Sequence, residues 1–117
     1  MSSRVEIRDG VLVALDGTGA VVHRRAPVAT HFVQVLALAE RFIVLEDYYH
    51  FPAGVSNLYC LDTELHLVWS AQLPGPSDTY ANPVTQTAAG LVGATWECYR
   101  CTIDPETGRI LQREFTK

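Results

Sequence analysis

The sequence has little of what builds disulfide frameworks, nucleic-acid surfaces or membrane spans. Its 117 residues include three cysteines, an odd number that excludes a complete intrachain disulfide framework. Nine Lys and Arg stand against thirteen Asp and Glu, and the net charge of -4 gives no basic footprint for nucleic acid. No apolar run approaches membrane-spanning length, and the N-terminus lacks the apolar core of a signal peptide. We therefore expect a cytoplasmic protein that binds neither nucleic acid nor membrane.

The common catalytic and cofactor motifs are also missing. There is no Gly-rich phosphate loop, no H-E-x-x-H and no nucleophile elbow. Cys98 and Cys101 have C-x-x-C spacing, but this redox motif normally begins a helix, whereas here it crosses a predicted hairpin turn. Cys60 and four dispersed histidines supply no second ligand pair for zinc. We expect no cofactor and no metal, and binding rather than catalysis.

What the sequence does contain is a globular composition and an internal repeat. It is 48% hydrophobic and 19% charged, and its length fits a single domain over 1–117. Asp16, Asp62 and Asp104 each end an apolar run that is followed by a turn and another strand. Their intervals of 46 and 42 residues are close to the length of one four-stranded propeller blade, about 40–45 residues. The sequence therefore predicts three repeat units, approximately 4–27, 31–74 and 82–117.

The first unit has room for only about three strands. Asp9-Gly10 between two apolar runs predicts a type I′ hairpin turn, because that turn needs positive φ at both central residues. A second turn follows at 17–20, and the segment 21–25 predicts a short polar strand.

The second unit begins with the segment 31–40, whose Leu, Ala and Glu content also suits a helix. We predict a strand because its counterpart, 83–89, contains Val and two Thr and is a poor helix former. The segment 42–45 is apolar at every position, which predicts a strand covered on both faces. From Leu67 to Leu73 apolar and mainly polar residues alternate, which predicts a one-faced outer strand.

The third unit repeats this order with strands predicted at 83–89, 91–96, 99–104 and 109–116. The turn from Pro105 to Gly108 separates the last two strands, with Gly where positive φ is favoured. Charges on the outer strand discourage pairing with another sheet edge.

Two of these runs carry a resemblance to a known family. The run 58–62 with Leu67-Val68-Trp69, and the run 103–111, resemble the repeats of pyrroloquinoline-quinone-type β-propellers, in which a Leu-Asp, a Thr-Gly turn and a Trp-bearing outer strand recur. The resemblance is best over 32–115, and it implies an all-β antiparallel meander of blade-like sheets. A β-sandwich or barrel is the alternative fold. The chain is also similar to small bacterial proteins, some of which serve as immunity proteins beside toxins.

Three units are too few for a usual closed ring of blades, so the cofactor binding of a complete ring is not carried over to this chain. The sheets form either an open partial propeller or half of a six-unit ring completed by a second copy. Because sheet faces are left unpaired, we expect a homodimer.

One insertion stands out when the units are aligned. Between its second and third strands the second unit carries the aromatic segment 48–56, where the other units have a two-residue turn. Loops on a rigid scaffold commonly carry recognition, although these aromatics could instead cap the core. Trp96, at the predicted end of strand 91–96, would share a rim with this loop, together with the connection 74–82. We predict that a protein partner is contacted by Tyr48, Tyr49, His50, Phe51, Tyr80, Trp96 and Glu97.

Glu46 and Asp47 form an acidic pair just before the aromatic loop. Adjacent strand residues point to opposite faces, so the pair is poorly placed for shared acid–base work, but one of them could line a ligand pocket. The leading hypothesis is a non-enzymatic protein-binding module, such as an immunity or inhibitor protein. The alternatives are an enzyme or small-molecule-binding domain with its pocket around Glu46 or Asp47, His50 and Tyr80, and a self-assembling structural subunit.

Overall fold

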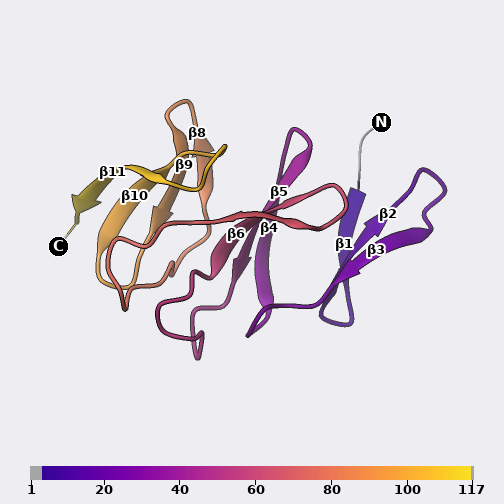
Figure 1. Ribbon diagram of the computed structural model, residues 1–117, viewed down its shortest axis with the longest axis horizontal. Coiled ribbons are helices and arrows are strands. Elements are labelled where there is room, and N and C mark those ends of the chain that lie inside the picture. The colour runs from indigo at the N-terminus through magenta and orange to yellow at the C-terminus, as the bar shows by residue number, and fades with distance from the viewer. Residues whose placement is uncertain (1–3, 117) are drawn as a thin grey trace.

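The computed structural model of the protein describes residues 4–116, which form eleven strands and no helix. The strands make three antiparallel sheets that stand side by side along the longest axis of a molecule measuring 48 × 31 × 18 Å (Figure 1). The first sheet and β11 lie at opposite ends of this row, so the sheets form an open fan. The described residues therefore contain no helix that could cross a membrane. The predicted all-β meander of blade-like sheets is confirmed.

The first sheet has three strands, as the length of its unit predicts. They follow the chain in the order β1 (Arg4–Arg8), β2 (Val11–Leu15) and β3 (Val21–Arg25). Asp9 and Gly10 connect β1 to β2 with φ of 50° and 76°. Both values are positive, so the predicted type I′ geometry is confirmed.

The second sheet has four strands, again in chain order. They are β4 (Phe32–Leu38), β5 (Arg41–Glu46), β6 (Leu58–Asp62) and β7 (Leu67–Ser70). The segment that also suited a helix is strand β4, which pairs with β5 from Phe32↔Glu46 to Leu38↔Arg41. Pairing with β5 therefore overrides the helix propensity of its Leu and Ala residues.

The third sheet repeats the four-stranded pattern. Its strands are β8 (Thr85–Thr87), β9 (Gly90–Ala94), β10 (Tyr99–Ile103) and β11 (Ile110–Phe115). β8 is shorter than the predicted strand 83–89 because the backbone of Val84 bonds to another sheet. Val84 N donates to Gln34 Oε1 at 2.7 Å, and Gln34 Nε2 donates to Val84 O at 2.8 Å.

The core consists of two layers of side chains, one on each face of the second sheet. Phe42 and Val44 of β5 pack in the layer that contacts the first sheet. Ile43 and Leu45 pack in the layer that contacts the third sheet. The prediction that 42–45 is covered on both faces is therefore confirmed, because alternate residues of a strand point to opposite faces.

The predicted alternation in β7 is wrong at its start. Trp69 pairs with Cys60 and Leu67 pairs with Leu61, so Val68 is an extra residue that forms a β-bulge. Because the bulge shifts the pattern by one residue, Leu67 is 53% exposed. Trp69 packs between the second and third sheets, and its Nε1 donates to Pro105 O at 3.1 Å.

The repeated Asp has a structural role in each unit. Asp62 Oδ1 accepts bonds from the backbone N of Glu64 and of His66, both at 2.9 Å, and thereby caps the turn after β6. Asp16 Oδ1 accepts the equivalent pair of bonds from Thr18 N and Ala20 N, and Asp104 Oδ1 accepts one, from Glu106 N. The repeat that identifies the blades is therefore a turn-capping motif.

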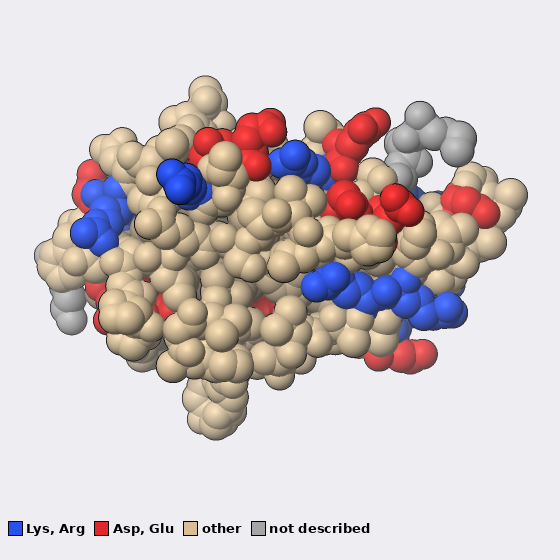
Figure 2. Space-filling view, viewed as in Figure 1, with Lys and Arg blue, Asp and Glu red and all other residues tan. Residues whose placement is uncertain are grey.

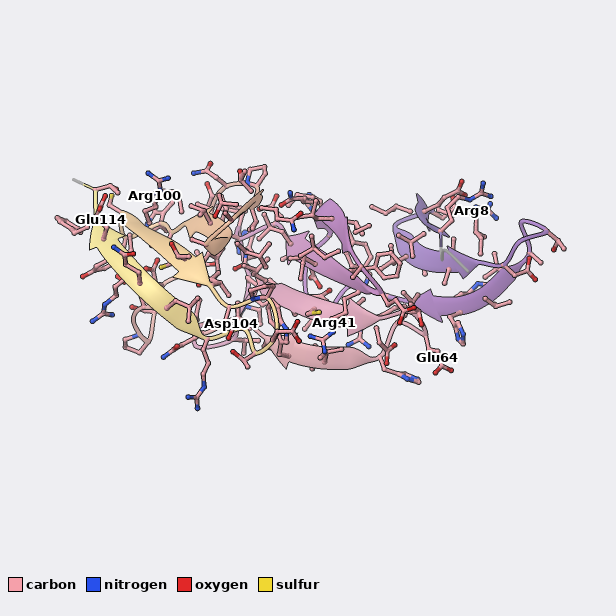
Figure 3. All side chains as sticks on the ribbon, turned by 90° about the horizontal axis from the view of Figure 1, so that it is seen from above. Arg8, Arg41, Glu64, Arg100, Asp104 and Glu114 are labelled. Carbon is pink, nitrogen blue, oxygen red and sulfur yellow. The ribbon has the colours of Figure 1, made fainter. Side chains whose placement is uncertain are left out.

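Charged side chains also connect neighbouring sheets at this end of the molecule. Arg41 of the second sheet lies close to Asp104 of the third in Figure 3. Arg41 Nη1 donates to the backbone oxygen of Glu106 at 3.3 Å. The carboxylate oxygen Oε2 of Glu106 lies 3.7 Å from the same nitrogen. The end that carries the Asp turns is thus bound by polar contacts, and the opposite end carries the aromatic loop.

Candidate functional site

The loop between β5 and β6 is folded by turns at the lower edge of the molecule in Figure 1. Asp47 N donates to His31 O at 2.9 Å, which fixes the start of the loop beside β4. Asp47 Oδ1 accepts a bond from Tyr49 N at 2.8 Å, and Phe51 N donates to Tyr48 O at 3.1 Å. The aromatic residues are therefore held on an ordered, hydrogen-bonded frame.

The four consecutive site residues on this loop differ in exposure. Tyr49 is 67% exposed, and the exposed ring of His50 lies with its centroid 4.2 Å from that of Tyr49. His50 has φ of 66°, in the left-handed region that non-Gly residues rarely adopt. Tyr48 and Phe51 are half-buried. The loop therefore presents Tyr49 and His50 to solvent.

Trp96 brings the third sheet into this surface. It lies in the turn after β9 and not at the end of the strand as predicted, because Cys98 N donates to Thr95 O at 3.1 Å and closes the turn there. The side chain of Trp96 is 63% exposed. Its ring centroid is 5.4 Å from that of Tyr48, with the planes inclined by 31°. The predicted proximity of Trp96 to the aromatic loop is confirmed.

The connection between β7 and β8 supports the same turn from the other side. Trp96 N donates to Thr79 O at 2.9 Å, and Glu97 N donates to Asp78 Oδ1 at 3.0 Å. The three segments that the sequence predicted to share one face thus meet at the same end of the sheets. We call this surface the aromatic rim, and it consists of Tyr48, Tyr49, His50, Phe51, Trp96 and Glu97.

Tyr80 does not belong to the aromatic rim, and its predicted place on a contact surface needs correction. Its side chain is completely buried between the second and third sheets. Its ring packs against Gly93, and its hydroxyl donates to Gln72 O at 2.6 Å. Burial raises the pKa of this phenol well above its ordinary value. Tyr80 therefore supports the rim from beneath.

Glu46 is a buried carboxylate with a structural set of partners. Its side chain is completely buried and accepts backbone bonds from Val28 N at 2.7 Å, Ala29 N at 3.1 Å and Thr30 N at 3.0 Å. The hydroxyl of Tyr59 is a further donor. Burial acts to raise the pKa of Glu46, but these hydrogen bonds together hold it below its usual value. The side chain therefore bonds the end of β5 to the segment 28–30, which connects the first sheet to the second.

Asn57 is a site residue that the sequence reasoning missed. It is completely buried, and its Nδ2 donates to the backbone oxygens of Glu46 and Tyr80, both at 2.8 Å. Its Oδ1 accepts bonds from Tyr80 N at 2.9 Å and Thr79 Oγ1 at 3.1 Å. The side chain therefore joins the aromatic loop to the connection that supports Trp96. One signal was available, a lone amide directly before the apolar strand β6.

A small cavity of about 180 Å³ opens beside the rim. Glu46 and Asp47, the predicted pocket residues, both contribute to its wall, and so does Tyr80. His50 of the predicted pocket is not among the lining residues. Asp47 is partly exposed, and its Oδ2 lies 3.3 Å from His31 Nε2.

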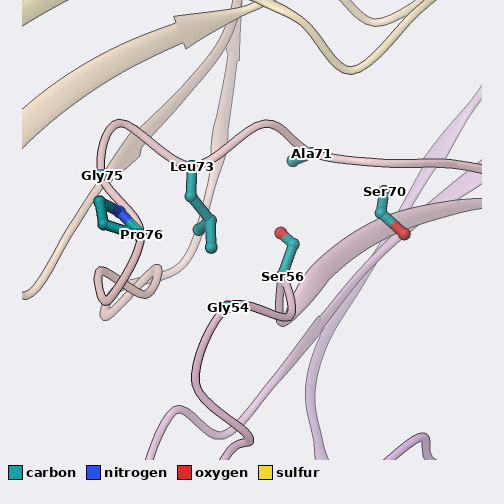
Figure 4. Close-up of a pocket in the computed structure, with 7 residues that line it drawn as sticks. All are labelled: Gly54, Ser56, Ser70, Ala71, Leu73, Gly75 and Pro76. Atoms are coloured by element: carbon teal, nitrogen blue, oxygen red, sulfur yellow. The ribbon is translucent and has the colours of Figure 1, made fainter.

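A wider, open hollow of about 570 Å³ lies between the aromatic loop and the connection after β7 (Figure 4). Small or apolar residues line it, namely Gly54, Ser56, Ser70, Ala71, Leu73, Gly75 and Pro76. None of these side chains is ionisable, so the hollow offers shape but no acid–base group.

The three cysteines are free thiols in different surroundings. Cys60 and Cys101 are buried, and burial raises the pKa of the Cys60 thiol to about 11. Cys98 is half-buried in the turn and Cys101 lies in β10, so the C-x-x-C spacing does cross a hairpin turn. Within residues 4–116 no group of three or more His, Cys, Asp or Glu side chains is arranged to hold a metal ion.

Comparison with solved structures agrees with the propeller-like arrangement. The chain is similar to BamB from Moraxella catarrhalis, with a TM-score of 0.60 and 22% sequence identity. BamB is a β-propeller of PQQ-like repeats. The match covers 92% of this chain and 31% of the BamB chain, so this chain spans about a third of that structure's length. At this identity the likeness shows the fold alone.

Comparison of the sequence with known proteins gives a family without an assigned activity. No curated protein matches the chain. One family model, described as a domain of unknown function (DUF7957), matches residues 20–115. That range includes β3, the whole second and third sheets and every residue of the aromatic rim. The chain therefore belongs to the DUF7957 family.

Proposed function

We propose that this protein is a protein-interaction module that binds a protein partner through the aromatic rim. The observation that carries the proposal is the pair of exposed aromatic side chains, Tyr49 at 67% and Trp96 at 63%, that two different sheets bring to one end. Aromatic residues dominate the binding energy of protein interfaces, and exposed apolar clusters on folded domains commonly mark contact sites.

The frame beneath the rim supports the same proposal. Asn57 and Asp78 bond the loop, the connection and the turn of Trp96 to one another, so the rim is formed before a partner arrives. A preformed surface loses less conformational entropy on binding than a flexible one.

Catalysis at the predicted pocket is less well supported. Glu46, its only completely buried carboxylate, already accepts bonds from three backbone N–H groups and the Tyr59 hydroxyl. A carboxylate engaged in this way is poorly placed to remove a proton from a substrate. Inhibition of a toxin or enzyme would be one form of the proposed binding, and the identity of the partner decides it.

The proposal is tested by comparing two variants in affinity capture from lysate of the native cell. Tyr49→Ala combined with Trp96→Ala removes the two most exposed aromatic residues of the rim. Leu111→Ala is the matched control, because Leu111 is 59% exposed but lies on β11 of the outer edge. Mass spectrometry with isotope-labelled standards measures how much of each captured protein remains.

We expect the unaltered protein and the control to capture a partner in near-stoichiometric amount. The double variant should capture at least about tenfold less of that partner. The melting temperature of the double variant should stay within a few degrees of the unaltered protein, since both side chains are largely exposed. A partner that is retained in full by the double variant would overturn the proposal.

A further inference from the structure

The cavity lined by Asp47 is adjacent to the aromatic rim. Tyr48 forms part of its wall and also contacts Trp96, so any group that enters the cavity lies next to the rim. Val33, the extra residue at a bulge in β4, lines the opening and is 48% exposed. The opening is therefore accessible from the same side as the proposed partner.

The cavity has the dimensions and walls of a slot for one extended side chain. Its volume is about 180 Å³, and its apolar wall is made by Val33, Leu45, Tyr80 and Pro83. Leu45 and Tyr80 are core residues held in place by the packing of the second sheet against the third. An apolar stem entering this slot would be removed from water, which is favourable in proportion to the area buried.

The charge at this cavity has one sign. Asp47 is the carboxylate available there, because the oxygens of Glu46 are occupied by their own hydrogen-bond donors. Asp47 Oδ1 is used by Tyr49 N, whereas Oδ2 faces the exposed imidazole of His31 at 3.3 Å. No Lys or Arg is among the lining residues. In Figure 2 the lower edge beneath the second and third sheets is almost entirely uncharged, and no Lys or Arg is visible on it.

A slot with apolar walls and a carboxylate-bearing residue in its lining fits a side chain with an apolar stem and a cationic end. Lys and Arg have this form, since they bury their stems against apolar surface and keep the charge at the tip. The aromatic ring of Tyr48 in the wall adds a face that attracts cations. An acidic or purely apolar side chain would satisfy only part of this surface.

We propose that this cavity receives a lysine or arginine side chain of the protein partner, with the ammonium or guanidinium group paired to Asp47. This assignment rests on the proposed function, because it names the partner residue that anchors beside the aromatic rim. It makes the partner's contact segment basic, in agreement with the net charge of -4 on this chain.

The test uses capped single amino acids as probes at pH 7.5. The N-acetyl methylamides of lysine, arginine, norleucine and glutamate are titrated into labelled protein, and the backbone amide NMR shifts of Asp47, Tyr48 and Ala81 are followed. Norleucine has the apolar stem of lysine without the ammonium group. We expect weak binding of lysine and arginine, on the order of millimolar, and about tenfold weaker binding of norleucine.

Two substitutions separate the role of the charge from its surroundings. Asp47→Asn keeps the oxygen that accepts the bond from Tyr49 N and removes the charge. Asp62→Asn is the matched control, because Asp62 also caps a turn through Oδ1 and also has a histidine, His66, near Oδ2 at 3.8 Å. The preference for lysine over norleucine should be lost in Asp47→Asn and kept in Asp62→Asn.

Three outcomes would overturn the assignment of a cationic side chain. They are equal binding of lysine and norleucine, tighter binding of glutamate, and the absence of shifts at the cavity for every probe. These results leave the capture experiment with Tyr49→Ala and Trp96→Ala unaffected, so failure of the anchor and failure of the proposed function are distinguishable.

Discussion

The carboxylate of Glu46 makes the stability of the protein depend on pH. Its pKa in the folded protein is below the ordinary value of 4.5, whereas in the unfolded chain it titrates near that value. The stabilisation is therefore fully present above the unfolded-state pKa and is lost as pH falls through the folded-state pKa. We expect the free energy of unfolding, measured by urea denaturation, to decrease between about pH 5 and about pH 3.

Glu46→Gln isolates this contribution. The amide would place an N–H donor among three backbone donors, so we expect a loss of about 2–4 kcal/mol at pH 7 and a shallower decrease in acid. Some acid sensitivity should remain, because bonds from Thr18 lower the pKa of Asp16 as well. Asp47→Asn, a change at the partly exposed neighbour, is the control. An acid decrease of unaltered size in Glu46→Gln would contradict this role.

The sequence predicted that Glu46 and Asp47 point to opposite faces, and in the structure their carboxylates have different partners. The sequence could not tell which of the two is buried, because that depends on how the residues before β4 approach the end of β5. Only after the chain folds do three N–H groups from 28–30 meet one carboxylate. The burial of Tyr80 was unpredictable for a similar reason, since its contacts with Gln72 and Gly93 come from other segments.

At the scale of elements, the contact between the second and third sheets depends on a glycine in the turn before β11. Gly108 has φ of 77°, and a Cβ atom there would lie 2.5 Å from Trp69 Cε3. Gly10, in the turn after β1, has nearly the same φ of 76° but nothing within 4 Å of a Cβ. The two positions therefore separate steric clash from backbone strain.

We expect Gly108→Ala to destabilise the protein by about 3 kcal/mol or more, because strain at positive φ and displacement of Trp69 act together. Gly10→Ala should lose only about 1 kcal/mol, since it incurs the strain alone. Urea denaturation followed by Trp fluorescence measures both. Equal losses in the two variants would show that Trp69 moves aside without penalty.

The elements that follow from local pattern were predicted from the sequence, and those set by contacts between elements were not. The apolar run 42–45 and the Asp turns carry their signals in a few consecutive residues. The bulge at Val68 has no such signal, because it arises from pairing with β6. The early end of the pairing near Val84 depends on the side chain of Gln34 in another sheet.

For the whole molecule, the open arrangement of the sheets bears on its oligomeric state. The first sheet has three strands where the others have four, so within residues 4–116 β1 lacks the neighbour that β4 and β8 provide in the other two sheets. We expect this edge to pair in a homodimer, because exposed strand edges favour association. Light scattering at low micromolar concentration should give twice the mass of one chain.

A mass of one chain in the same measurement would remove the model of a ring completed by two copies. The Tyr49→Ala, Trp96→Ala variant serves as the control, because a dimer that forms through β1 should not depend on the aromatic rim. If the double variant alone becomes monomeric, the rim is itself the contact between copies.

The chain order of the strands also bears on how the protein is made. In the described residues each strand pairs only with its neighbours in sequence. Each sheet is therefore made of consecutive strands, and none waits for a strand from a later part of the chain. Short-range pairing of this kind favours rapid folding, and domains of stacked repeats can fold by adding one unit to the next. During synthesis the second sheet can therefore complete its hydrogen bonds while the third is still inside the ribosome, and the growing chain exposes one unpaired sheet face at a time.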